Sequence, residues 1–99
     1  MTRTVRILRR AERDLQQIYD LVGREAPGRA DRFIDGLLDA IASLETLSER
    51  GASPRDPVLR ARDYRFLTHG DYLVFYKVLA RQVRVYRVLH GHRAYRGLL

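Results

Sequence analysis

The chain has 99 residues, no cysteine, and 19 lysine and arginine residues against 12 acidic ones, which gives a formal net charge of +7. This length allows a single domain over residues 1–99, and the lack of cysteine excludes disulfides and thiolate metal sites. A hydrophobic content of 45% excludes a disordered chain. Neither a membrane-length apolar run nor a signal peptide is visible in the sequence, so we expect a cytoplasmic protein with no membrane partner.

The first half of the sequence predicts a strand followed by a helical hairpin. Apolar residues alternate over residues 4–8, which is typical of a short strand. Over residues 11–22 the apolar residues recur instead at helical spacing. A break at residues 26–28 precedes a second apolar stripe over residues 30–47, about five helical turns long. Two amphipathic helices joined by a short break predict an antiparallel hairpin.

The second half predicts a loop and then a three-stranded meander. Glycine, serine and proline over residues 50–62 indicate the loop. Patterns with a period of two predict strands over residues 63–68, 72–79 and 83–90, joined by tight turns. The sequence therefore predicts an α+β fold in the order β-α-α-β-β-β, with the hairpin packed on one face of a mainly antiparallel sheet.

The sheet face that the hairpin leaves open should be basic and aromatic. Tyrosines exposed there would form a platform for stacking bases, whereas the commoner outcome for such strand residues is half-burial in a core. The sequence does not fix the strand register. The residues that could lie on this face are Tyr64, Arg65, Tyr76, Arg84, Tyr86 and Arg87.

Positive charge is concentrated in the second half of the chain. Residues 1–49 hold 8 arginines and 9 acidic residues, a net charge of −1. Residues 50–99 hold 10 arginines and one lysine against 3 acidic residues, a net charge of +8. A GC-rich genome is one explanation for the excess of arginine over lysine. The other is a surface for carboxylates or phosphates, which arginine binds through paired hydrogen bonds. We expect an acidic or a nucleic-acid partner to contact this half.

No metal or cofactor site is indicated, and catalysis is not clearly signalled. His69 lies at a turn, and His90 and His92 have no third ligand near them in the sequence. The acidic residues lie mainly on the predicted helices, where we expect solvated faces. A nuclease would need an acid and a base, but arginine does not deprotonate and a free tyrosine titrates only at about pH 10. Its candidate residues would be Arg60, Arg62, Arg65, Arg87, Arg93 and Tyr95.

Several segments occur in an order that is typical of one family. The leading helix carries Ala11, Asp14-Leu15 and Ile18-Tyr19, the second ends in Leu44 and Leu47, and the last strand closes with Arg87-Val88-Leu89-His90-Gly91-His92-Arg93. With these segments the chain resembles the RelE/ParE superfamily of bacterial toxins over nearly its whole length. The resemblance implies a toxin encoded beside an antitoxin that binds and neutralises it. RelE-like members cut messenger RNA in the ribosome's decoding site, whereas ParE-like members poison DNA gyrase.

One residue favours the ParE-like branch. RelE-like nucleases resemble Gly-Tyr-Arg-x-x-Tyr where this chain reads Asp71-Tyr72-Leu73-Val74-Phe75-Tyr76, so Leu73 stands in the place of an arginine that serves the transition state. The resemblance therefore implies a gyrase-binding toxin rather than an enzyme. The alternatives are a ribosome-dependent nuclease, which would use Arg65, Arg93 and Tyr95, and an inactive interaction module.

The resemblance also implies two binding surfaces. The antitoxin would bring an acidic, flexible C-terminal segment, and the hairpin would add apolar contacts. Gyrase would contact the C-terminal segment around Arg93, Tyr95 and Leu98, which we expect to lie outside the core. The alternative is that Leu98 and Leu99 cover a sheet edge. Direct binding of nucleic acid by the chain alone is not expected. The candidate antitoxin contacts are Arg60, Arg62, Arg65, Arg84, Arg87 and Arg93.

Overall fold

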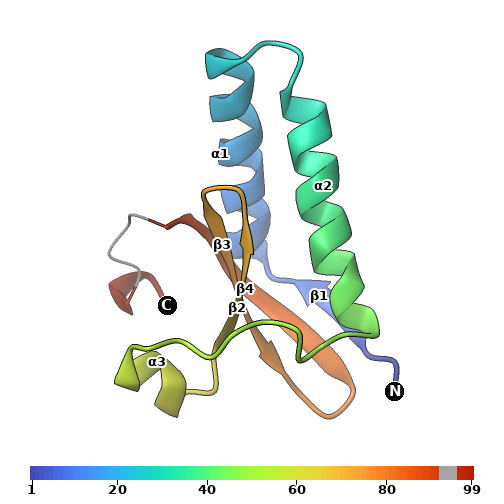
Figure 1. The fold of residues 1–99 in the computed structure, drawn as a ribbon, viewed down its shortest axis with the longest axis vertical. Helices are drawn as coiled ribbons and strands as arrows, with labels where there is room; N and C mark the ends of the chain where they lie inside the picture. Colours follow the sequence, from blue (N-terminus) through green and yellow to red (C-terminus); the bar gives the residue numbers. More distant parts are fainter. Residues whose placement is uncertain (92–95) are drawn as a thin grey trace.

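The computed structural model describes residues 1–91 and 96–99, which form an α+β fold with two long helices on one face of a four-stranded sheet (Figure 1). Three of the sheet's strands follow one another at the C-terminal end of the chain. The helices and strands are β1 (Thr4–Ile7), α1 (Arg9–Glu25), α2 (Ala30–Ala42), α3 (Pro57–Ala61), β2 (Arg65–His69), β3 (Tyr72–Val78) and β4 (Gln82–His90). The predicted fold class and element order are thus confirmed.

The strands lie in the order β1-β4-β3-β2. The pairs β2–β3 and β3–β4 are antiparallel, and β1 pairs in parallel with β4. This parallel pairing is possible because the chain between β1 and β4, which includes the helical hairpin, α3, β2 and β3, is long enough to connect parallel neighbours. The N-terminal strand therefore lies directly beside the last strand of the chain.

The main core lies between the hairpin and the sheet. Helical spacing brings Ile18 of α1 and Leu37 and Ile41 of α2 onto the faces turned toward the strands, where they are buried. Within residues 1–91 and 96–99, no helix is both long enough and apolar enough to cross a membrane. The strand residues buried in this core are Leu67, Val74, Tyr76, Val83, Val85 and Val88.

The second helix is shorter than predicted. It ends at Ala42, and a 3-10 turn over Ser43–Glu45 follows it. The hydroxyl of Ser43 donates to the carbonyl of Ala40 at 2.6 Å, and such local bonds compete with continued helix. Leu47, predicted to end the helical stripe, consequently lies beyond the helix with a 57% exposed side chain.

The predicted loop over residues 50–62 contains a short helix, so this part of the prediction is wrong. The carboxylate of Asp56 accepts hydrogen bonds from the backbone N–H groups of Val58 (2.8 Å) and Leu59 (3.2 Å), and proline follows it at the first helical position. An aspartate cap followed by proline is a helix start. Asp63 has a positive φ of 64°, which breaks the chain direction, so the next strand begins at Arg65 and not at 63.

A second cluster covers part of the other sheet face. Leu59 of α3 packs there with Tyr64, Phe75 and Leu89, all buried. Figure 1 shows α3 and the C-terminal end on the side of the sheet away from the hairpin. The open face is therefore smaller than the sequence predicted. The half-buried residues around this cluster are Phe66, Leu73, Tyr86, Leu98 and Leu99.

Candidate functional site

A basic groove runs beside the end of β3. The cavity has a volume of about 710 Å³, and five cations line it against two acidic residues, Glu49 and Asp63. An excess of positive charge in a groove raises the local concentration of acidic ligands. The structure brings three of the predicted antitoxin contacts together here and adds two cations that sequence reasoning missed. The five cations are Arg3, Arg60, Arg62, Arg65 and Lys77.

Backbone carbonyls hold several of these arginines in place. Nη1 of Arg65 donates to the carbonyls of Gly51 (2.8 Å) and Glu49 (3.3 Å). Nε of Arg60 donates to Pro54 (3.0 Å), and Nε of Arg3 donates to Leu79 (2.8 Å). Neutral carbonyls leave the guanidinium charges uncompensated. Three of the five cations of the groove are thus held in place by the protein's own backbone.

Lys77 rests on two tyrosine rings at this groove. Its Nζ lies 4.4 Å from the centroid of the Tyr64 ring and 5.2 Å from that of Tyr86. The two rings meet edge to face at 5.3 Å. Burial raises the pKa of Tyr64, so its phenol stays neutral. The tyrosines therefore form a seat for a cation, and the predicted stacking platform is not present at Tyr64, which is only 5% exposed.

Tyr76 also differs from the prediction, because it faces the main core and is completely buried. A register shift between Phe75 and Tyr76 brings Tyr76 opposite Val85. Its hydroxyl accepts a hydrogen bond from the backbone N–H of Gly51 at 2.9 Å. Burial raises its pKa, while that hydrogen bond acts in the other direction. Tyr76 is thus a structural residue that anchors the segment after α2.

Arg87 is not the free surface arginine that the sequence suggested. It is 6% exposed and forms a two-pronged ion pair with Asp14, in which Nε donates to Oδ2 (2.7 Å) and Nη2 to Oδ1 (2.9 Å). The hydrogen bond to Asp14 is the main reason that the pKa of Arg87 is raised. Asp14, expected on a solvated helix face, is 5% exposed. The pair is therefore part of the architecture.

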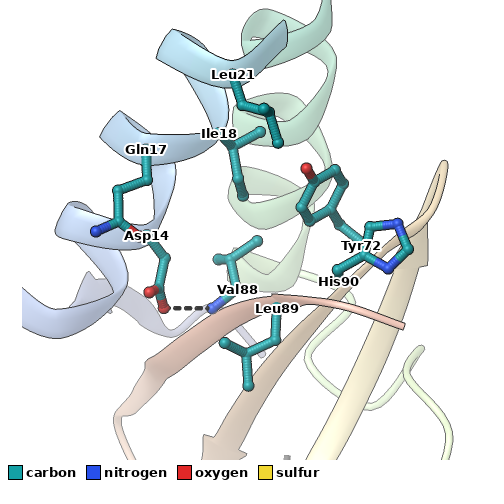
Figure 2. A pocket seen from close by; sticks show the side chains of 8 residues that line it. All are labelled: Asp14, Gln17, Ile18, Leu21, Tyr72, Val88, Leu89 and His90. Carbon is teal, nitrogen blue, oxygen red and sulfur yellow. Dashed lines mark hydrogen bonds between the residues drawn. The ribbon is translucent and has the colours of Figure 1, made fainter. Parts of the chain in front are cut away.

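A small cavity lies beside this ion pair, between α1 and the strands β3 and β4 (Figure 2). It has a volume of about 280 Å³ and includes His90, whose ring meets that of Tyr72 edge to face at 5.4 Å. Asp14 points into it, but both of its oxygens are engaged, and Oδ2 also accepts the N–H of Val88 at 3.0 Å. No group of histidines, cysteines and acidic residues able to hold a metal occurs within the described part of the chain.

An apolar groove opens on the outer side of the hairpin. Its volume is about 450 Å³. Tyr19 and Leu38 on its rim are each 38% exposed, and the Tyr19 hydroxyl donates to Asp31 at 2.8 Å across the two helices. Partly exposed apolar side chains in a groove suit an amphipathic partner. The apolar residues of the groove are Ile7, Leu15, Tyr19, Ile34 and Leu38.

The predicted target-binding residues are only partly visible. Arg93 and Tyr95 lie outside the described residues. Leu98 is half-buried and packs against the second cluster, and its carbonyl accepts a hydrogen bond from Nη1 of Arg87 at 2.9 Å. The expectation that Leu98 lies outside the core is therefore wrong. It holds the C-terminal end against the sheet.

Leu73 lies in apolar surroundings. It is the register partner of Leu89 on β4 and of Thr68 on β2. It packs against the second cluster, which contains Phe75 and Leu89. The position that would carry the transition-state arginine of a nuclease is thus built into a hydrophobic contact.

Comparison with known proteins agrees with this fold. The family model "ParE toxin of type II toxin-antitoxin system, parDE" matches residues 5–95. No curated protein sequence is significantly similar to the chain. A solved structure of the chromosomal ParDE toxin–antitoxin system from P. aeruginosa superposes with a TM-score of 0.75 at 19% identity, covering 90% of this chain and 96% of that one.

A second similar structure is the toxin–antitoxin complex RelBE2 from Mycobacterium tuberculosis. Its TM-score is 0.68 at 22% identity, and the match covers 91% of this chain and 99% of that one. At such identities the two structures show a shared fold. The family model, by contrast, matches most of the sequence, and with it the chain belongs to the ParE toxin family of type II toxin–antitoxin systems.

Proposed function

We propose that this protein is a cytoplasmic toxin that stops growth by binding DNA gyrase, performs no chemistry of its own, and is neutralised by a cognate antitoxin. Membership of the ParE family supports a toxin with an antitoxin partner. The position of Leu73 is the observation that favours a binding protein over a nuclease.

A nuclease of this superfamily would need a cation at Leu73 to stabilise the charge that develops on the phosphate. Leu73 instead packs against a hydrophobic cluster with Leu89 as its register partner. Arg65, which would serve such a site, is tied to backbone carbonyls near the opposite end of β3. These features support a surface that binds without cutting RNA.

The antitoxin would use two features of this chain. Its acidic segment would enter the basic groove, where Arg60, Arg62 and Arg65 lie, and its apolar residues would pack into the hairpin groove beside Tyr19 and Leu38. Charges at the rim mainly speed association, whereas buried apolar anchors slow dissociation. Arg93 remains a further candidate contact.

For gyrase, we propose the C-terminal segment around Arg93 and Tyr95. The anchoring of Leu98 on the second cluster supports this, because it ties down one end of that segment. Leu98 would thus position the contact and not form it. Anchoring Leu98 reduces the conformational entropy that the C-terminal end loses when it binds.

The test is to induce the toxin in cells without its antitoxin and to record which process stops first. The proposal expects early DNA damage signalling and accumulated gyrase–DNA cleavage complexes, with messenger RNA intact. Codon-phased cuts in messenger RNA with intact DNA would support the ribosome-dependent nuclease instead. Normal growth at the same expression level would support an inactive interaction module.

A further inference from the structure

Three cations stand in a row across the sheet, on the face turned away from α1 and α2. Arg6 on β1 is the register partner of Arg84 on β4, and Arg84 is the register partner of Lys77 on β3. Their neighbours Val5, Val83 and Val78 contact the main core, and side chains alternate along a strand, so the three cations face the other way. Because neighbouring strands lie about 4.8 Å apart, the row is about 10 Å long.

Among residues 1–91 and 96–99, no acidic side chain forms an ion pair with the row. The one ion pair there joins Arg87 to Asp14, away from the row. Nε of Arg84 is buried and has no hydrogen-bond partner. Like charges placed directly opposite each other destabilise a sheet, and a buried donor without an acceptor does so as well. Such an arrangement weakens the folded state, which suggests that it serves a ligand.

The chemistry of the row indicates what this ligand is. Lys77 lies over one face of the Tyr64 and Tyr86 rings. Tyr64 is only 5% exposed, and Tyr86 packs partly into the second cluster. The row therefore presents positive charge without a stacking platform, unlike a surface for single-stranded nucleic acid. Lys77 also lines the basic groove, which makes the row and the groove one continuous positive surface.

We propose that Arg6, Arg84 and Lys77 form an anion-binding row for the carboxylates of an extended acidic peptide. Carboxylates on alternate residues of an extended chain lie about 7 Å apart, which suits a row of this length. Arg84 would be the central contact, because its fork can hold a carboxylate by two hydrogen bonds. The proposal rests on the proposed function in one respect, namely that the antitoxin's acidic segment supplies the peptide.

The test measures binding of a fluorescent synthetic peptide of alternating glutamate and threonine to the full-length chain, by anisotropy at low salt. Arg84→Gln should weaken binding about tenfold, and Arg6→Gln and Lys77→Gln should each weaken it severalfold. Arg24→Gln and Arg32→Gln remove the same charge from exposed positions on α1 and α2, and each should change binding less than about twofold. The matching peptide with glutamine in place of glutamate should not bind.

Two further measurements keep the outcomes distinct. Arg84→Lys keeps the charge but loses the fork, and it should fall between the wild type and Arg84→Gln. Thermal melts should show Arg6→Gln, Arg84→Gln and Lys77→Gln folded, since each removes a like charge from the sheet. Equal losses in the row and control variants would overturn the proposal, because only net charge would then matter.

The same assay with a single-stranded DNA oligonucleotide of equal charge tests the alternative that the row binds nucleic acid. Tighter binding of this oligonucleotide than of the peptide, lost in Arg84→Gln, would overturn the proposal in favour of a nucleic-acid site. The result is independent of the target, since no gyrase is present. A failure of peptide binding would overturn the anion-binding row without bearing on gyrase inhibition. A failure of gyrase inhibition would overturn the proposed target without bearing on peptide binding.

Discussion

Asp14 on α1 and Arg87 on β4, 73 residues apart, form a buried two-pronged ion pair that fastens the helical hairpin to the sheet. Asp14 also accepts the N–H of Val88. That bond matters because β1 pairs with β4 only as far as Val85, so beyond this point β4 has no strand on that side. The Asp14 carboxylate thus accepts a backbone hydrogen bond where β4 has no neighbouring strand, and it also neutralises the buried charge of Arg87.

Replacing Asp14 with alanine should destabilise the protein strongly, by about 3–5 kcal/mol, because Arg87 is left as a buried charge without a partner. Urea denaturation of Asp14→Ala, Arg87→Met and the double variant measures this as a double-mutant cycle. The double variant should be more stable than the two single losses added together. Additive losses would show that the two side chains do not act as a pair.

Replacing Tyr76 with phenylalanine should lower the free energy of unfolding by about 1–3 kcal/mol, because the N–H of Gly51 then loses its buried acceptor. The matched control is Tyr19→Phe, which removes an exposed hydroxyl bonded to Asp31 and should have a much smaller effect. Chemical denaturation compares the two variants. Equal effects would mean that the Tyr76 hydroxyl is not the link between the sheet and Gly51.

The protein should lose stability at alkaline pH. Burial raises the pKa of Tyr64, Tyr72 and Tyr76 in the folded state. The stability that comes from keeping these phenols neutral is fully present below the unfolded pKa of about 10, and it is lost as the pH rises through the folded values. Unfolding free energies measured from pH 8 to 11 should therefore fall above pH 10. The fall should be smaller in Tyr76→Phe than in the wild type, and an unchanged slope would contradict this assignment.

Deleting residues 94–99 should separate folding from toxicity. The deletion removes the packing of Leu98 and Leu99 and the carbonyl that Arg87 bonds, but the Asp14 pair remains to satisfy Arg87. We expect a soluble product that still binds antitoxin and no longer inhibits growth. Leu98→Ala is the matched control, because it weakens the packing and keeps the segment. If the truncated protein is insoluble, the C-terminal end is needed for folding, and this result would contradict its proposed role in toxicity.

The helices and strands were largely predictable because their apolar residues follow clear periods. The boundaries failed where local side-chain chemistry decided them. At the end of α2 the Ser43 hydroxyl bonds the Ala40 carbonyl. The Asp56 carboxylate caps α3 inside a segment that its glycine and prolines marked as a loop. The cap was visible as Asp56-Pro57, but without a following apolar period it did not predict a helix.

The candidate site was less predictable because it depends on pairing between distant segments. Arg6 belongs to a half of the chain with a net charge of −1, and only the parallel pairing of β1 with β4 places it beside Arg84. The burial of Arg87 likewise depends on its pairing with Asp14. From the helical periodicity alone, Asp14 was predicted to lie on the solvent-exposed face of an amphipathic helix. Charge counted along the sequence predicted only the part of the basic groove formed by Arg60, Arg62 and Arg65, which are close in sequence, and it missed Arg3 and Lys77.

The central claim is that the toxin acts on gyrase and not on messenger RNA. The most direct measurement adds the purified chain to purified gyrase, ATP and plasmid DNA and scores supercoiling and linear DNA trapped in cleavage complexes. We predict dose-dependent inhibition with trapped linear DNA, reversed by the cognate antitoxin. Unimpaired supercoiling by gyrase, together with cleavage of messenger RNA on ribosomes by the same preparation, would contradict the account.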